Sequence, residues 1–260
     1  MQTAYEGVAG QRIVVTAGAS GIGRAIVNML VAHGARVHIC DVADNFLEEF
    51  AADHPTAGVT KADVSREADV DRLFGEARET LGGLDALINN AGVAGPTGAI
   101  EDLDSAEWRR CIDVCLTGQF LCAQRATSML KEAGGGSIVG MASVAGKYGY
   151  AFRTPYSSAK FGIIGLCQSL AKELGPSNIR VNAILPGIVE GPRIESVIRN
   201  RAEQVGVSYK EMEKEYLDKT SLRRMVTADD VAAMIMFLLS NAGGNLSGQS
   251  IAVDGNVETL

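Results

Sequence analysis

Short apolar runs alternate with longer amphipathic stretches along this chain. The short runs are rich in Val, Ile and Ala and predict buried strands, whereas the longer stretches carry apolar residues at helical spacing and predict helices. The predicted strands are residues 12–16, 35–40, 57–62, 86–89, 137–140, 180–184 and 249–253, and the main predicted helices are 24–34, 70–81, 108–133, 156–174 and 229–240. This alternation predicts an α/β fold, a Rossmann-like, doubly wound sheet of about seven parallel strands with helices on both faces.

The predicted organisation is a single domain. No Pro- or Ser-rich linker interrupts the series of elements, so we expect residues 1–260 to form one domain. The segment 190–224 is polar and helical in pattern. Such a segment is typical either of a lid over a substrate or of a solvated pair of helices.

Composition narrows the class of protein. The 24 basic and 31 acidic residues give a net charge of −7, which disfavours a nucleic-acid-binding protein because such proteins usually carry a basic face. No apolar run approaches the ~20 residues of a membrane-spanning helix, and residues 1–10 show no secretory signal. The 5 cysteines include no C-x-x-C pair and the 3 histidines are scattered. We therefore expect no disulfide framework, no metal site and a reducing, cytoplasmic location.

A glycine-rich turn follows the first predicted strand. Its glycines allow a tight turn and a close approach of backbone N–H groups to a diphosphate, and the start of the next helix adds favourable partial charge. The alternative is an ordinary strand–helix turn, although the position between a strand and a helix is the one that a phosphate site requires. The candidate cofactor-binding residues here are Thr16, Gly18, Ser20, Gly21, Ile22 and Gly23.

Asp41 ends the second predicted strand. An acidic side chain at this place can accept hydrogen bonds from the hydroxyls of an adenosine ribose, and it repels a 2′-phosphate. The residue therefore favours NAD over NADP as the cofactor. The alternative role is that of a helix N-cap or a loop acid.

The most specific signal is Tyr156 with Lys160 one helical turn later, and with Ser143 upstream at the end of a strand. Positions i and i+4 share a helix face, so the lysine ammonium can favour the deprotonated tyrosine and make it a usable general base. Ser143 can hold a substrate oxygen by a hydrogen bond. A tyrosine–lysine pair alone is often a solvated helix face, whereas its combination with the serine and the glycine turn predicts a catalytic site.

Together these residues resemble the classical short-chain dehydrogenase/reductase family, over nearly the whole chain from Thr16 to Gly255. The resemblance implies hydride transfer between a substrate carbinol carbon and a nicotinamide, with Tyr156 as acid/base and Lys160 also at the nicotinamide ribose. It implies one dinucleotide-binding and catalytic domain and a homotetramer, assembled through the helices of Trp108 and Tyr156. The further cofactor-binding positions that it implies are Asp63, Val64, Asn90, Ala91, Gly92, Pro186, Gly187 and Val189.

Three positions depart from the family's pattern. Ala17 stands at the usual first glycine of the turn, where a methyl group is tolerated if φ is negative. Cys115 stands where the family has an asparagine that helps to hold a water in the proton relay, and a thiol is a poor donor and acceptor. Gly191 replaces a threonine that touches the carboxamide of the nicotinamide.

Cys111, Cys115 and Cys122 share a helix face and are expected to pack in the core.

Arg153 is a candidate substrate residue together with Ser143 and Tyr156. With Arg193 nearby in the expected fold, Arg153 can hold a carboxylate, phosphate or sulfonate. The sequence thus favours an NAD-dependent oxidoreductase of a small polar secondary alcohol or ketone, such as a sugar, polyol or hydroxy acid. Two alternatives stay open, an NADP-dependent 3-oxoacyl-thioester reductase and a dinucleotide-binding regulator with impaired catalysis.

Overall fold

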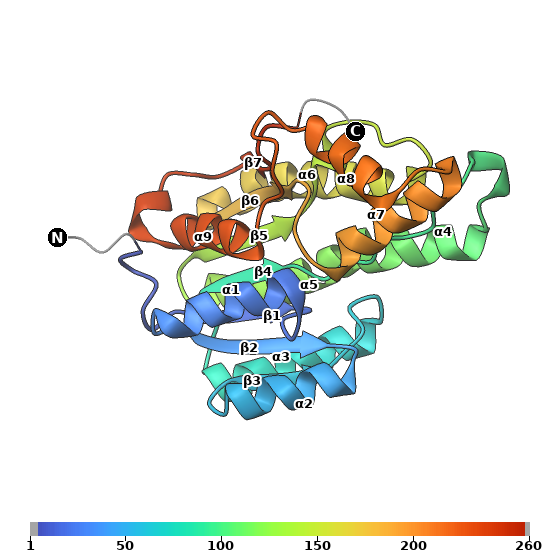
Figure 1. Ribbon diagram of the computed structural model, residues 1–260. Coiled ribbons are helices and arrows are strands. Elements are labelled where there is room, and N and C mark those ends of the chain that lie inside the picture. Colours follow the sequence, from blue (N-terminus) through green and yellow to red (C-terminus); the bar gives the residue numbers. More distant parts are fainter. Residues whose placement is uncertain (1–4, 258–260) are drawn as a thin grey trace.

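The structure is a computed structural model that describes residues 5–257 (Figure 1), so residues 1–4 and 258–260 of the predicted domain lie outside the described part. Its strands are β1 Arg12–Thr16, β2 Arg36–Asp41, β3 Gly58–Lys61, β4 Ala86–Asn89, β5 Gly136–Met141, β6 Ile179–Pro186 and β7 Ser250–Val253. Its α-helices are α1 Gly21–Ala32, α2 Asp44–Asp53, α3 Glu67–Leu81, α4 Ser105–Ile112, α5 Gly118–Glu132, α6 Thr154–Leu174, α7 Pro192–Val205, α8 Tyr209–Asp218 and α9 Ala228–Leu239.

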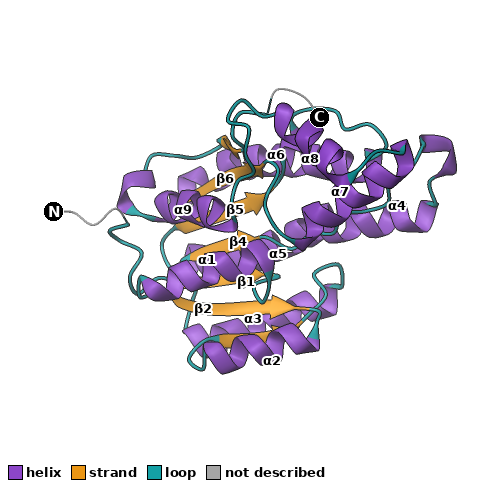
Figure 2. Cartoon of the chain, viewed as in Figure 1, coloured by secondary structure: helices purple, strands orange, loops and turns teal. Residues whose placement is uncertain are grey.

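The strands form one sheet in the order β3-β2-β1-β4-β5-β6-β7, and every neighbouring pair is parallel. Figure 2 shows helices on both faces of this sheet. The direction of winding reverses between β1 and β4, and open α/β sheets bind ligands at the carboxyl ends of the strands beside such a reversal. The predicted fold, a doubly wound sheet of seven parallel strands, is confirmed.

Two apolar cores hold the helices against the sheet. Along β1, Ile13 and Val15 belong to one core and Val14 to the other, because successive side chains of a strand point to opposite faces. The first core also contains side chains of α1, α2 and α9, and the second contains side chains of α3, α5 and α6. Helices on both faces therefore fix the strand ends from which the loops of the candidate site emerge.

The predicted helix 108–133 differs in two ways from the helix found. It begins earlier, at Ser105, because Asp104 caps it by accepting hydrogen bonds from the N–H groups of Ala106 and Glu107 at 2.6 and 3.0 Å. A π-helical turn, Asp113–Thr117, then separates α4 from α5. Such turns inside α-helices often mark functional sites.

Other boundaries differ less. The sequence pattern did not predict α2, which buries only Leu47 and Phe50 and has no side-chain cap, so its apolar periodicity is weak. The first helix begins at Gly21, earlier than predicted. The helical pattern of 190–224 corresponds to α7 and α8. Within residues 5–257, no helix is both long and apolar enough to span a membrane.

Candidate active site

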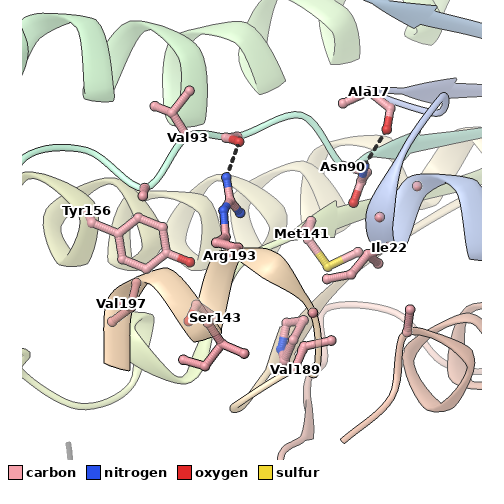
Figure 3. Close-up of a pocket in the computed structure, with 18 of the residues that line it drawn as sticks. Ala17, Ile22, Asn90, Val93, Met141, Ser143, Tyr156, Val189, Arg193 and Val197 are labelled. Atoms are coloured by element: carbon pink, nitrogen blue, oxygen red, sulfur yellow. Dashed lines mark hydrogen bonds between the residues drawn. The ribbon is translucent and has the colours of Figure 1, made fainter. Parts of the chain in front are cut away.

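A cavity of about 470 Å³ opens beside the β1/β4 reversal, at the carboxyl ends of the strands. In Figure 3 the glycine turn with Ala17 and Ile22 forms one side of it, and Tyr156 and Ser143 form the other. The predicted site residues on its wall are Ser20, Gly21, Ile22, Gly23, Asn90, Gly92, Ser143, Arg153, Tyr156, Lys160, Pro186, Gly187 and Val189. The structure thus brings most of the predicted set together.

Tyr156 and Lys160 both reach this wall from the first turns of α6. Lys160 is buried, and its Nζ donates a hydrogen bond of 2.7 Å to the carbonyl oxygen of Met141 at the end of β5. The same Nζ lies 5.5 Å from the centroid of the Tyr156 ring. Because water reaches this place poorly, the ammonium favours negative charge that develops on the tyrosine oxygen. The pair is arranged for proton transfer at the Tyr156 hydroxyl.

Ser143 follows β5 and precedes a single 3₁₀ turn, Val144–Gly146. Its Oγ accepts a hydrogen bond of 3.2 Å from the N–H of Ala145, which fixes the side chain and leaves its own hydroxyl hydrogen for donation. The residue is buried yet lines the cavity on the same side as Tyr156 (Figure 3). A substrate oxygen between these two hydroxyls would therefore meet a donor and a proton carrier.

The start of α1 fits a dinucleotide diphosphate. Its N-cap, Ser20, makes no side-chain hydrogen bond to the helix, and the first turn contains no acidic residue, so the first N–H groups keep their capacity for an anion. Gly21 has a φ of +52°, and a Cβ added there would meet no atom within 4 Å. The backbone is therefore open to a ligand at Gly21, as a phosphate cradle requires.

Ala17 has a φ of +49°, so the condition under which a methyl group is tolerated at this position, a negative φ, is not met. Hydrogen bonds on both sides hold this conformation. The N–H of Gly18 donates to the carbonyl of Cys40 at 3.1 Å, and Asn90 Nδ2 donates to the carbonyl of Ala17 at 3.0 Å. A left-handed conformation costs an L-residue about 1 to 2 kcal/mol, which explains why a glycine suits this place.

Thr16, Gly18 and Ala91 lie outside the cavity wall and build the turn behind it. Thr16 Oγ1 accepts hydrogen bonds from the N–H groups of Asn90 and Ala91 at 3.0 and 2.9 Å, which ties β1 to the loop after β4. A Cβ on Gly18 would lie 2.6 Å from Cγ2 of Ile39, so packing requires glycine there. These residues shape the backbone of the site.

Asp41 also lies outside the cavity wall, at the buried end of β2. Its Oδ1 accepts hydrogen bonds from the N–H groups of Val42 and Ala43 at 2.8 and 3.3 Å. The side chain therefore stabilises the loop before α2, as the alternative interpretation expected. No hydrogen bond to Oδ2 is found in the described part of the chain, so this oxygen keeps its capacity to accept.

Asp63 and Val64 are engaged within the protein. Asp63 pairs with Arg110 at 2.9 Å and accepts a hydrogen bond of 2.7 Å from Ser65 Oγ. Burial raises the pKa of Asp63, but the hydrogen bonds from Ser65 and the charge of Arg110 outweigh it and hold the pKa below its ordinary value. Val64 is buried and packs closely against Gly118. An adenine contact by this pair stays a prediction.

The π-helical turn places Cys115 at the edge of the site. Its Sγ accepts a hydrogen bond of 3.3 Å from the N–H of Val93, and a Cβ on Gly92 would lie 3.6 Å from both this sulfur and Lys160 Nζ. The hydrogen bond from Cys111 lowers the pKa of Cys115; burial opposes this shift, and the charge of Lys160 and the Val93 N–H reinforce it. All three cysteines of this helix face are buried, which agrees with the predicted packing.

Much of the apolar cavity wall could not be predicted from the sequence pattern. Ile194 and Val197 reach the cavity from α7, and their i, i+3 spacing inside a polar segment was the available signal. Gly191 also lines the cavity with a φ of +134°, a conformation in which the threonine of the family pattern would be strained. The other wall residues that were not predicted are Val93, Ala94, Met141, Ala142, Tyr150, Glu190, Pro192 and Ala228.

Arg153 and Arg193 both line the cavity, as expected. Arg153 is buried, and its Nη2 donates a hydrogen bond of 2.7 Å to the carbonyl of Ala94. Arg193 is exposed on α7, and its Nη2 donates a hydrogen bond of 2.8 Å to the carbonyl of Gly92, which joins α7 to the loop after β4 (Figure 3).

The fold and this site define a dinucleotide-binding α/β oxidoreductase. A family model described as enoyl-(acyl carrier protein) reductase matches residues 16–257. The chain belongs to the short-chain dehydrogenase/reductase family.

Known proteins resemble the chain over nearly its full length. It is 33% identical over 252 residues to 2-(S)-hydroxypropyl-CoM dehydrogenase 3 of Xanthobacter autotrophicus, covering 95% of this chain and 96% of that protein. It is 35% identical over 246 residues to cis-4-hydroxycyclohexanecarboxylate dehydrogenase of Sinomonas cyclohexanicum, covering 93% and 94%. The crystal structure of NAD⁺-bound xylitol dehydrogenase superposes with a TM-score of 0.91 at 26% identity, covering 96% and 99%.

Proposed function

We propose that this protein is an NAD-dependent oxidoreductase that transfers a hydride between a nicotinamide and a small polar secondary alcohol or ketone. The observation that carries the proposal is the meeting of Ser143, Tyr156 and Lys160 on one side of a cavity whose other side is an open glycine turn. One side can bind the alcohol oxygen and the other a dinucleotide diphosphate. The names of the relatives support it, since they act on hydroxypropyl and hydroxycyclohexane compounds.

In this proposal the nicotinamide supplies the hydride chemistry, and the protein handles the proton. Ser143 donates a hydrogen bond to the substrate oxygen. Tyr156 takes the proton of the alcohol during oxidation and returns it during reduction. Lys160, anchored to the carbonyl of Met141 beside the Tyr156 ring, would hold a ribose hydroxyl of the cofactor.

NAD is the cofactor that Asp41 supports. Its buried position at the end of β2 and the free Oδ2 suit hydrogen bonds from two ribose hydroxyls, and its charge repels a 2′-phosphate. The structure of a related xylitol dehydrogenase contains NAD⁺. An NADP-dependent 3-oxoacyl-thioester reductase agrees less well with this carboxylate. A regulator with impaired catalysis agrees less well with the intact Ser143, Tyr156 and Lys160.

The proposal includes three further predictions from the sequence. The segment 190–224 acts as a lid, which agrees with the position of α7 over the cavity. A homotetramer agrees with the exposed rings of Phe120 on α5 and Phe161 on α6, at 46% and 47% exposure. The cytoplasmic location agrees with 5 cysteines that are all free.

The direct test is a screen of secondary alcohols and ketones, followed by nicotinamide absorbance, with NAD and NADP in parallel. Sugars, polyols, hydroxy acids and a 3-oxoacyl thioester make up the panel. We expect turnover of a secondary alcohol with NAD. Turnover of the thioester alone with NADPH would favour an NADP-dependent 3-oxoacyl-thioester reductase. Cofactor binding without any turnover would favour a dinucleotide-binding regulator with impaired catalysis.

A further inference from the structure

Arg153 presents a buried charge to the cavity. The residue is 6% exposed and lines the cavity, and its Nη2 donates to the carbonyl of Ala94. Its Nε is buried and makes no hydrogen bond in the described part of the chain. A buried donor without an acceptor costs stability, so the guanidinium keeps hydrogen-bonding capacity that the described part of the protein does not use.

No carboxylate within residues 5–257 forms an ion pair with Arg153. Its guanidinium instead lies 5.4 Å from the ring of Tyr150 and 5.1 Å from the ring of Tyr156. Aromatic faces orient a guanidinium and compensate part of its lost hydration, but they do not neutralise it. The charge is therefore held in place beside the catalytic tyrosine without a counter-ion.

The position of Arg153 is also locally unfavourable in two respects. Arg153 occupies the N-cap of α6 and makes no capping hydrogen bond, although Ser, Thr, Asp or Asn would stabilise that position. The residue before it, Phe152, has a φ of +63°, which is unfavourable for an aromatic L-residue. Local conflicts of this kind gather where function requires a particular side chain.

The remaining charges of the cavity wall do not take the place of a counter-ion. Lys160 is bound to Met141 O and serves the catalytic tyrosine, and the exposed Arg193 is bound to Gly92 O. Glu190 is the acidic residue on this wall in the described part, and it is exposed in the loop before α7. The wall thus carries three cations and one carboxylate in a protein whose net charge is −7.

We propose that Arg153 binds an anionic group on the substrate, so that the preferred substrate is a hydroxy acid or the corresponding keto acid. A carboxylate accepts hydrogen bonds from the N–H groups of the guanidinium that face the cavity. The carbinol then lies at Ser143 and Tyr156. This inference rests on the proposed function, because it assigns the substrate class of the same site.

The test compares acids with their uncharged amides in the wild-type enzyme. The kinetic pair is 4-hydroxycyclohexanecarboxylate and its primary amide, and the binding pair is cyclohexanecarboxylate and cyclohexanecarboxamide, titrated by calorimetry into the enzyme saturated with NAD⁺. A charge-assisted hydrogen bond predicts roughly a 10- to 100-fold preference for each acid. Equal or tighter binding of the amide overturns the proposal.

The variant Arg153→Gln keeps a hydrogen-bonding side chain and removes the charge. It should lower kcat/KM for the acid roughly 10- to 100-fold while the value for the amide changes little, and Arg153→Lys should restore part of the acid preference. Arg199→Gln on the exposed face of α7 is the matched control and should leave the preference unchanged. Equal losses on acid and amide would show that Arg153 merely positions Tyr156.

The two hypotheses fail differently. If no alcohol is oxidised with either nucleotide, the proposed function is wrong, and calorimetry still decides whether Arg153 binds an anion. If amides are oxidised as well as acids, the proposed function stands and the anionic substrate class is wrong. Wild-type measurements decide this even where Arg153→Gln fails to fold.

Discussion

Cys115 Sγ lies against the backbone of Val93, accepting a hydrogen bond from its N–H at 3.3 Å and donating one to its carbonyl at 3.5 Å. The neighbouring thiol of Cys111 lowers the pKa of Cys115; burial opposes this shift, and the charge of Lys160 and the Val93 N–H reinforce it. The anionic form of Cys115 is therefore favoured at lower pH than for an ordinary thiol. Through these two hydrogen bonds to the Val93 backbone, Cys115 keeps polar contacts at the position where the family has an asparagine.

The first prediction concerns this thiol pair. Replacing Cys111 with Ala removes the neighbouring thiol and should raise the pKa of Cys115, which thiolate ultraviolet absorbance during a pH titration measures. Cys167→Ala is the control, because burial raises the pKa of Cys167 to about 12 and keeps it silent at neutral pH. An unchanged titration in Cys111→Ala would contradict this effect of the Cys111 thiol. In Cys115→Asn the change in absorbance from the Cys115 thiolate should be lost. Any change in rate at the same pH should be lost with it.

The second prediction concerns Tyr156. Tyr156→Phe keeps the ring beside Lys160 and removes the proton carrier, so kcat should fall by about 100-fold or more. Fluorescence titration with NADH should show that cofactor affinity changes little. Tyr148→Phe, a partly exposed tyrosine outside the cavity wall, is the control. Retained turnover of every accepted alcohol in Tyr156→Phe would refute the catalytic assignment.

The third prediction separates the two roles of Asp41. Asp41→Asn keeps an oxygen for the N–H groups of Val42 and Ala43 and removes the charge that repels a 2′-phosphate. The ratio of kcat/KM for NAD to that for NADP should fall by roughly 10-fold or more, while the melting temperature changes little. Asp44→Asn, whose exposed carboxylate pairs with Lys61 at 2.6 Å, is the control. An unchanged ratio would leave Asp41 with its loop role alone.

The fourth prediction follows from the left-handed backbone of Ala17. Ala17→Gly relieves a strain of about 1 to 2 kcal/mol and adds unfolded-state entropy that costs about 0.5 to 1 kcal/mol, so the variant should be more stable by up to about 1.5 kcal/mol. Urea denaturation of the protein without cofactor measures this difference. Ala19→Gly, a buried residue without a positive φ, should be destabilised instead. Loss of stability in both variants would contradict the strain.

The fifth prediction concerns acid stability. His38 is buried and bonded to Thr60 Oγ1 at 2.8 Å; burial lowers its pKa to about 4, against a raising effect of Glu76. The unfolded chain has an ordinary histidine pKa of about 6.5. Between these values the unfolded state binds more protons, so the free energy of unfolding falls as pH falls, by up to about 3 kcal/mol.

Urea denaturation at several pH values measures this slope. His38→Gln should flatten the slope below pH ~6.5, whereas His33→Gln, at an exposed histidine, should retain it. The slope, rather than the absolute stability, is the deciding quantity, because removing a buried side chain also changes packing. A slope equal to that of the wild type in His38→Gln would contradict the prediction.

The positions of the strands and of the principal helices along the chain could be predicted because their signals are local. An apolar run such as Ile13–Val15 predicts a buried strand, and the glycines after it predict a turn, from only a few neighbouring residues. The helix α2 could not be predicted, since it buries only two apolar side chains. The π-helical turn at Cys115 was also missed, because it depends on packing between distant elements rather than on local spacing.

The same distinction holds for the site. Tyr156 and Lys160 could be predicted as a pair from their helical spacing, and the structure brings both to one cavity wall with Ser143. The φ of Ala17 could not be read from its neighbours, because hydrogen bonds from Asn90 help to hold it. The unpaired Nε of Arg153 likewise appears only when the fold shows that no described acceptor reaches it.

The reversal of the sheet between β1 and β4 has a mechanical consequence. The cavity joins the turn after β1, at Gly21, to the loop after β4, at Gly92, and these segments are far apart along the chain. A molecule that fills the cavity therefore contacts both the β1 half and the β4 half of the sheet and stabilises their association without a covalent bond. Because a bound molecule stabilises the folded state by mass action, the free energy of unfolding should rise with the concentration of any ligand that fills this cavity.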